Sequence, residues 1–392
     1  MSLSSIRFAG VHAGIKAAGA LDLALIAADR PCAVAALYTQ NRVQAAPVRL
    51  SQRRSARGLA QAIVVNSGNA NACTGAAGMQ AATRSCAQVA AALGIDPELV
   101  LVASTGVIGT PLPVARLEAA VPALVADLCA DGWPRFAQAI MTTDRGPKTS
   151  QRTAHLDQQP LHVLGVGKGA GMYHPDMATT LAFLCIDAVV PASLLQAMLR
   201  RGADATFHRA SVDGDTSTND SLFLLATGDG VRIDPDDAAA VAVAEAAVTE
   251  VLEDLTKQMV ADGEGAAHLV RLEIRGAPND DEALQAARAV ATSPLVKTAL
   301  AGVDPNWGRI AMALGRSGAH FDPEQLAIRV EDIWLVRQGT GVGQAAEEAA
   351  RVHMQRPEYT LHIDLGAGQG KTHYWMCDMG HEYIRINADY RS

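Results

Sequence analysis

The residues with the clearest chemical potential lie in one glycine-rich segment, residues 165–182, which reads GVGKGAGMYHPDMATTLA. Within it Thr179 follows a small residue, Ala178, and stands close to the start of an apolar run. A threonine in this setting can attack the carbonyl group before it, and hydrolysis of the resulting ester turns it into a new N-terminal residue. Its free α-amino group, with a pKa of roughly 7.7 to 8.0, can then accept the proton of its own hydroxyl. The segment therefore allows an N-terminal nucleophile, although threonine at a strand start is also favoured simply for packing.

The glycines of the same segment raise the alternative of a nucleotide-binding loop. A P-loop needs a glycine five residues before its Gly-Lys pair and a Ser or Thr after the lysine, but His162 and Gly169 hold those places. A dinucleotide-binding GxGxxG pattern fails as well, because Ala170 stands where the third glycine belongs. Both mismatches count against a nucleotide-binding interpretation.

The elements around the segment predict a layered α/β fold. Apolar runs predict strands at residues 62–65, 99–103, 161–165 and 181–190, and alternation predicts further strands at 359–365, 372–379 and 383–386. Helical spacing predicts helices at 78–93, 117–129 and 279–291, and a long helix ending at 255 that has Asp234 as its N-cap and Pro235 as its first residue. We expect a first domain at 1–185 that carries the loop, a central region at 186–280 that completes the active site, and a smaller C-terminal α+β domain at 281–392.

Composition narrows the class of protein further. A net charge of −8 argues against a nucleic-acid-binding surface, and the cluster Arg53, Arg54 and Arg57 is expected in a solvated loop. No apolar stretch approaches the roughly 20 residues that cross a bilayer, and no secretion signal is expected. The six cysteines are scattered without metal-ligand spacing, which is typical of reduced, mostly buried thiols. We expect a cytoplasmic protein that contacts neither membrane nor nucleic acid.

Nine motifs, in order along nearly the whole chain, resemble those of the ornithine acetyltransferases, also called bifunctional glutamate N-acetyltransferases. They are LDLALI (21–26), VVNSGNANACTG (64–75), STGVIG (104–109), IMTTD (140–144), KGAGM with HPDMAT (168–179), VDGDTSTND (212–220), DGEGA (262–266), DPNWGR (304–309) and INADY (386–390).

The resemblance implies a fold and a reaction. The fold would be an N-terminal-nucleophile-like sandwich of the ornithine acetyltransferase type, with a smaller C-terminal α+β domain. Acetyl would move from N-acetylornithine to glutamate by a ping-pong mechanism through an ester on Thr179, in arginine biosynthesis. Self-cleavage between Ala178 and Thr179 would give chains 1–178 and 179–392, which assemble as an α2β2 heterotetramer. The family needs no cofactor or metal, and some members use acetyl-CoA as a second acetyl donor.

The resemblance also implies roles for individual residues. Thr179 would be the nucleophile, while Thr105 and Gly106 would form the oxyanion hole. The substrate-binding positions would be Thr142 (in preference to Thr143), Lys168, Thr179, Glu264, Asn387 and Ser392. A lysine can meet the α-carboxylate of an amino acid, and a glutamate can meet the ammonium group of ornithine. The segment 212–220 is expected to be structural, near the site and without a metal.

Two departures from the family pattern and three alternatives complete the expectations. Ala267 and His268 stand where relatives have Thr-Lys, a change expected to bear on the substrate more than on the reaction, and Ser392 replaces a common terminal threonine. The nearest alternative is an amidase or aminopeptidase, in which water attacks the same acyl-enzyme. A non-processing paralogue that binds acylated amino acids and a nucleotide-binding protein are the others.

Overall fold

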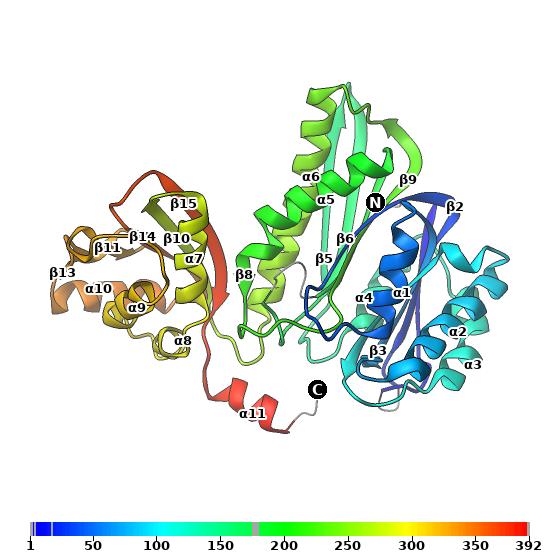
Figure 1. The fold of residues 1–392 in the computed structure, drawn as a ribbon, viewed down its shortest axis with the longest axis horizontal. Coiled ribbons are helices and arrows are strands. Elements are labelled where there is room, and N and C mark those ends of the chain that lie inside the picture. Colours follow the sequence, from blue (N-terminus) through cyan, green and yellow to red (C-terminus); the bar gives the residue numbers. More distant parts are fainter. Residues whose placement is uncertain (1–2, 4, 17–18, 175–179, 390–392) are drawn as a thin grey trace.

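The computed structural model describes residues 3, 5–16, 19–174 and 180–389. Within these ranges the strands form two mixed sheets, each accompanied by its own helices, and the two units lie side by side in Figure 1. The first sheet has the order β4 (Val100–Val107), β3 (Leu59–Asn69), β2 (Leu23–Tyr38), β9 (Ser221–Arg232), β7 (Leu181–Val189), β6 (Gln159–Lys168) and β5 (Lys148–Leu156), with β1 (Ile6–Val11) paired to β2. The second has the order β13 (Thr340–Gly341), β12 (Ile333–Arg337), β11 (Ala327–Val330), β14 (Glu358–Asp364), β10 (Leu269–Ala277), β15 (Gly370–Cys377) and β8 (Ala210–Ser211). The expected mixed α/β architecture is confirmed.

The long strand β2 joins the two halves of the first sheet. Its first part pairs with β3 and its last part with β9, and the register shifts between Ala27 and Cys32. Side chains from both halves meet in one core cluster, where Phe183 of β7 stacks on Phe223 of β9 with ring centroids 5.5 Å apart. Phe136, which lies on a neighbouring helix, makes a T-shaped contact with Phe183. Their ring centroids are 5.1 Å apart. The change of partner along β2 therefore lets distant segments share one core.

Helices accompany both halves of this sheet (Figure 1). The half made of β1 to β4 packs with α1 (Ala46–Ser55), α2 (Gly75–Leu93), α3 (Val114–Ala126) and α4 (Trp133–Ile140), and the other half packs with α5 (Ala192–Ala205) and α6 (Ala238–Ala261). On β6, a Cβ atom at Gly165 or Gly167 would overlap Val251 or Met259 of α6. These two glycines therefore allow α6 to lie close to the strand, which explains a glycine-rich sequence without a phosphate-binding loop.

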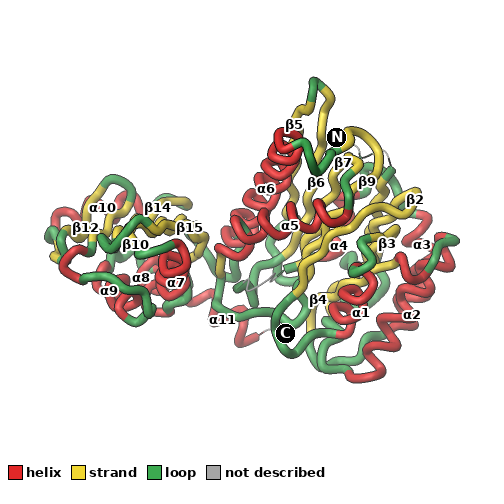
Figure 2. The backbone as a smooth tube through the Cα atoms, turned by 45° about the horizontal axis from the view of Figure 1, so that its top comes forward, coloured by secondary structure: helices red, strands yellow, loops and turns green. Residues whose placement is uncertain are grey.

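The second unit contains α7 (Asp280–Ala291), α8 (Pro294–Ala301), α9 (Trp307–Gly315) and α10 (Gln344–Met354). Val270, Leu272 and Ile274 alternate along β10 and pack into the core that α7 covers. After β15, the last helix, α11 (His381–Asp389), lies between the two units in both views (Figures 1 and 2). The C-terminal segment therefore returns toward the first sheet.

Most predicted elements are confirmed. Strands predicted at 62–65, 99–103, 161–165, 181–190, 359–365 and 372–379 correspond to β3, β4, β6, β7, β14 and β15, and helices predicted at 78–93, 117–129 and 279–291 correspond to α2, α3 and α7. The cysteines are free thiols, four of them buried. No helix among the described residues has the length and apolar character needed to span a membrane.

Three expectations were wrong. Residues 383–386 belong to helix α11 rather than to a strand. The alternation of Tyr383, Ile384, Arg385 and Ile386 imitates a strand, because β-branched and aromatic residues favour strands. The long helix begins at Ala238, and Asp237 instead of Asp234 caps it, since its carboxylate accepts hydrogen bonds from two backbone N–H groups of the first turn. Arg54 is not in a solvated loop: it lies on α1, 4% exposed, and donates to the Val100 carbonyl and to Glu98.

Candidate active site

A cavity of about 430 Å³ brings together residues that are far apart in the sequence. Six of the sequence-predicted site residues line it: Thr105, Gly106, Thr142, Lys168, Glu264 and Asn387. Thr143 lines it as well, so the preference for Thr142 rests on the contacts described next. Ala178, Thr179 and Ser392 lie outside the described residues, whereas Thr180, which follows Thr179 in the chain, forms part of the wall.

Lys168, the last residue of β6, places a buried cation in this wall. Its side chain is 10% exposed, and its Nζ donates to the hydroxyl oxygens of Thr142 at 2.8 Å and Thr105 at 3.2 Å. Burial lowers the pKa of this ammonium group, and the nearby carboxylate of Asp144 opposes that change. One cation therefore contacts both a predicted oxyanion residue and a predicted substrate residue.

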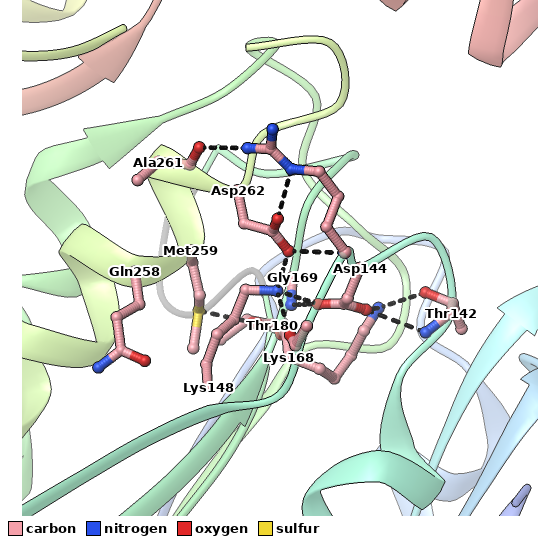
Figure 3. A network of polar contacts seen from close by, with 12 residues as sticks. Thr142, Asp144, Lys148, Lys168, Gly169, Thr180, Gln258, Met259, Ala261 and Asp262 are labelled. Atoms are coloured by element: carbon pink, nitrogen blue, oxygen red, sulfur yellow. Dashed lines mark hydrogen bonds and ion pairs between the residues drawn. The ribbon is translucent and has the colours of Figure 1, made fainter. Parts of the chain in front are cut away.

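Asp144 holds the surrounding backbone in place (Figure 3). Its Oδ1 accepts hydrogen bonds from Lys148 Nζ at 2.6 Å and from the Gly169 N–H at 2.8 Å, and its Oδ2 accepts one from the Thr142 N–H at 2.9 Å. Burial alone would raise the pKa of Asp144, but Lys168 and Lys148 lower it to about 2. A single carboxylate therefore fixes the loop after α4, the start of β5 and the end of β6 relative to one another.

Thr105 and Gly106 lie near the end of β4, beside β3. Gly106 has φ of +131°, and a Cβ atom there would overlap the backbone of Gly68 on β3. Only glycine fits this close crossing. The crossing fixes the backbone that carries the Thr105 hydroxyl toward Lys168.

Glu264 and Asn387 connect the cavity to the C-terminal helix. The Asn387 Nδ2 donates to Glu264 Oε2 at 2.7 Å, and the Glu264 N–H donates to the Ala170 carbonyl at 2.8 Å. Glu264 is 8% exposed. Helix α11 supplies both Asn387 and Tyr383 to the lining, so this helix closes one side of the cavity.

The two departures after the DGEGA motif lie outside the described lining of the cavity. The backbone N–H groups of Ala267 and His268 donate to Asp378 Oδ1 at 2.9 and 2.8 Å. The His268 ring nitrogen Nδ1 lies 3.3 Å from Asp378 Oδ2. These two positions are therefore connected to the site through the backbone that leads to Glu264.

The segment 212–220, expected to be structural and near the site, contributes Asp213 and Asp220 to the lining of the cavity. Asp220 is 3% exposed, lines the cavity, and its Oδ2 has no hydrogen-bond partner among the described residues. Burial raises its pKa well above the ordinary value, although Ser217 and Lys168 oppose the shift. Asp213 accepts hydrogen bonds from the backbone N–H groups of Met172 and Tyr173 at 2.6 and 2.9 Å. The available signal was the presence of three aspartates, Asp213, Asp215 and Asp220, in the segment that precedes the buried strand β9.

The arrangement suits an amino-acid ligand. Lys168 offers a cation, Glu264 offers a carboxylate, and the threonine hydroxyls between them can bind polar atoms of the ligand. Among the described residues, no group of three or more His, Cys, Asp or Glu side chains is placed to hold a metal ion. These features define a site for a small zwitterionic molecule.

Comparisons with known proteins identify the family. The ArgJ family model matches residues 7–392. The arginine biosynthesis bifunctional protein ArgJ of Geobacter sulfurreducens is 44% identical over 393 residues, and that of Syntrophotalea carbinolica is 45% identical over 395 residues, with 100% of each chain covered in both cases. The crystal structure of the Bacillus halodurans protein is 38% identical with a TM-score of 0.50, and the match covers 52% of this chain and 96% of that chain.

The chain therefore belongs to the ArgJ family. It is an acyltransferase of arginine biosynthesis, with the ornithine acetyltransferase and glutamate N-acetyltransferase activities of this bifunctional family. The resemblance inferred from the nine motifs is thus confirmed.

Substitution of Asp144 tests the buried network. In Asp144→Asn the buried ammonium group of Lys168 loses its nearest carboxylate and Lys148 keeps only that of Asp262, so the free energy of unfolding should fall by about 3–5 kcal/mol. The matched control is Asp29→Asn, which breaks the exposed pair between Arg7 and Asp29 and should cost less than about 1 kcal/mol. Urea unfolding at pH 7 measures both, and equal losses would contradict a structural role for Asp144.

Acid unfolding provides a second test of the Asp144 carboxylate, through its lowered pKa. Folding lowers the pKa of Asp144 from 3.8 to about 2, so its stabilisation is complete above pH ~5 and is lost as the pH falls toward 2. The wild-type protein should therefore lose more stability between pH 5 and pH 2 than Asp144→Asn does. A larger loss in the variant would show that the pKa is not lowered.

Proposed function

We propose that Thr179 is the nucleophile of a ping-pong acetyl transfer, and that the chain first cleaves itself between Ala178 and Thr179. The observation that carries this proposal is the contact of Lys168 with both Thr105 and Thr142, in a cavity whose wall also includes Thr180. The polypeptide in the Bacillus halodurans crystal structure is about half as long as this chain, as a processed chain would be.

The first half-reaction removes acetyl from N-acetylornithine. The neutral amine of Thr179 takes the proton of its own hydroxyl, and the hydroxyl oxygen bonds to the acetamide carbonyl carbon. Thr105 and Gly106 donate hydrogen bonds to the oxyanion that develops. The carbon–nitrogen bond then breaks, the proton passes to the leaving nitrogen, and ornithine departs from an acetyl ester on Thr179.

The second half-reaction reverses these steps with glutamate. The glutamate amine attacks the ester, the bond to the Thr179 oxygen breaks, and the oxygen regains a proton as N-acetylglutamate leaves. Both substrates carry an α-carboxylate, for which Lys168 and Thr142 are the proposed partners. Glu264 would bind the side-chain ammonium group of ornithine, with Asn387 and Ser392 completing the pocket.

Several wider features belong to the same proposal. The change of partners along β2, with helices on both halves, would correspond to the N-terminal-nucleophile-like sandwich, and the proposed domain limits stay near residues 185 and 280. The processed chains would assemble as an α2β2 heterotetramer in the cytoplasm. Acetyl-CoA would serve as an additional acetyl donor to the same threonine.

Replacing the proposed nucleophile tests the central step. Thr179→Ala should stay a single chain of 41.0 kDa on denaturing electrophoresis and should lose acetyl transfer, because both reactions need the same hydroxyl. Thr179→Ser keeps a hydroxyl and should still yield fragments 1–178 and 179–392, at a reduced rate. A cleaved and active Thr179→Ala protein would refute the assignment.

Thr105 tests the oxyanion hole separately. Removing one donor to a tetrahedral intermediate typically lowers kcat by ~10²- to 10³-fold, so Thr105→Ala should show a loss of that size with KM changed only a few-fold. Thr105→Ser should recover most of the rate. Steady-state kinetics with N-acetylornithine and glutamate distinguish the roles, since a loss confined to KM would make Thr105 a substrate-binding residue instead.

A further inference from the structure

A second cavity of about 430 Å³ lies on the second sheet, away from the proposed catalytic residues. Along β10, Val270, Leu272 and Ile274 face the core under α7, so the residues between them face the opposite side. Arg271, Glu273 and Arg275 occupy those positions, and neighbouring strands add further charged side chains to the same pocket. We call this cavity the sheet-face pocket.

Positive charge is concentrated in the sheet-face pocket. Its lining includes five cationic side chains, Arg209, Arg271, Arg275, Arg329 and Lys371, but only two carboxylates, Glu273 and Asp280. The whole chain, in contrast, carries a net charge of −8. Like charges that converge in a partly enclosed space repel one another, and a bound anion would offset this repulsion.

The carboxylates of the pocket do not neutralise these cations. Glu273 is shared between Arg271 at 3.2 Å and His362 at 2.9 Å, and Asp280 accepts the backbone N–H of Lys371 at 2.8 Å. Arg209, Arg329 and Lys371 form no ion pair with any described carboxylate. Arg209 donates to the Asp204 carbonyl at 2.9 Å and to the Thr372 hydroxyl at 3.0 Å, and Arg329 donates to the Glu331 carbonyl. These neutral acceptors leave the positive charges unbalanced, and an external anion could offset them.

The lowered pKa values of two histidines in the pocket reflect the same concentration of positive charge. Burial lowers the pKa of His373, and Arg209 and Arg271 lower it further. Its Nε2 is buried and has no hydrogen-bond partner among the described residues. The pKa of His362 is lowered by burial and by Arg329. Both shifts favour the neutral rings, and the His373 Nε2 atom is the one of the two that still has room for a hydrogen bond to a ligand.

We propose that the sheet-face pocket binds a phosphate ester. Guanidinium groups match the paired oxygens of phosphate, and ammonium groups add a point charge. The pocket is within the volume range of small-molecule sites, which leaves room for the organic part of the ligand beside its phosphate. The ligand is either a free phosphate ester or the phosphate-bearing part of coenzyme A.

The sheet-face pocket is close to the catalytic cavity along the chain. Arg209 lines the first and Asp213 lines the second, so the connecting segment through β8 spans at most about 14 Å. Asp213 in turn holds the backbone of Met172 and Tyr173 in the loop that leads to the proposed nucleophile. A ligand at Arg209 can therefore reach toward the catalytic cavity or influence the loop that forms its wall.

Calorimetric titration of the purified full chain tests the proposal, with orthophosphate and coenzyme A as separate probes and chloride at equal ionic strength as the blank. Both probes should bind to the wild-type protein, and Lys371→Gln and Arg209→Gln should each weaken binding about 10-fold, as expected for one charge-assisted hydrogen bond. Arg57→Gln, which changes an exposed arginine outside the pocket, should stay within 2-fold. Lys371 is exposed, so its replacement should leave thermal unfolding unchanged in the absence of the probes.

The two probes separate the sources of the phosphate. Coenzyme A binding at least 10-fold tighter than orthophosphate, with the gain lost in Lys371→Gln, would assign the pocket to the acetyl carrier. Equal affinities would assign it to a free phosphate ester. Absence of binding by both probes, or binding that neither pocket variant weakens, would overturn the proposal.

Discussion

A carboxylate buried between two ammonium groups is the constraint on which this site depends. Moving any of these charges out of water is costly, and their mutual attraction, the pairing of Lys148 with Asp262 and several hydrogen bonds offset that cost. Asp144 therefore needs Lys148 and Lys168 at fixed positions, and the backbone N–H groups of Thr142 and Gly169 complete its hydrogen bonds. The same geometry directs the Lys168 ammonium group toward Thr105 and the cavity. Structural charge balance and the proposed recognition of the substrate are thus parts of one network.

The fold supplies this network from separate segments. The two halves of the first sheet share β2, which brings β4 with Thr105 into the same unit as β6 with Lys168. The C-terminal helix α11 then reaches back from the second unit, and Asn387 binds Glu264. An acetyl donor and an acetyl acceptor can use one cavity in turn, because both are amino acids with the same α-carboxylate.

The sequence predicted the elements and family far better than it predicted the contacts. Strong apolar runs such as 181–190 identify strands because burial on both faces leaves a clear pattern. Residues 383–386 misled because the sequence Tyr-Ile-Arg-Ile is rich in residues that strands favour, and α11 buries no described side chain that would indicate a helix packed on a core. Asp144 and Asp220 could not be ranked from residue types, since their importance arises from burial and from partners distant in the chain. The roles of Thr179 and Ser392 remain predictions from the family motifs.

Trapping the covalent intermediate tests the central claim most directly. The purified enzyme is mixed with N-acetylornithine in the absence of glutamate, digested, and analysed by peptide mass spectrometry. The account predicts one acetyl group on the peptide that begins with Thr179, and loss of that group when glutamate is added before digestion. Acetyl on another residue, or release of acetate at the same rate with and without glutamate, would contradict it.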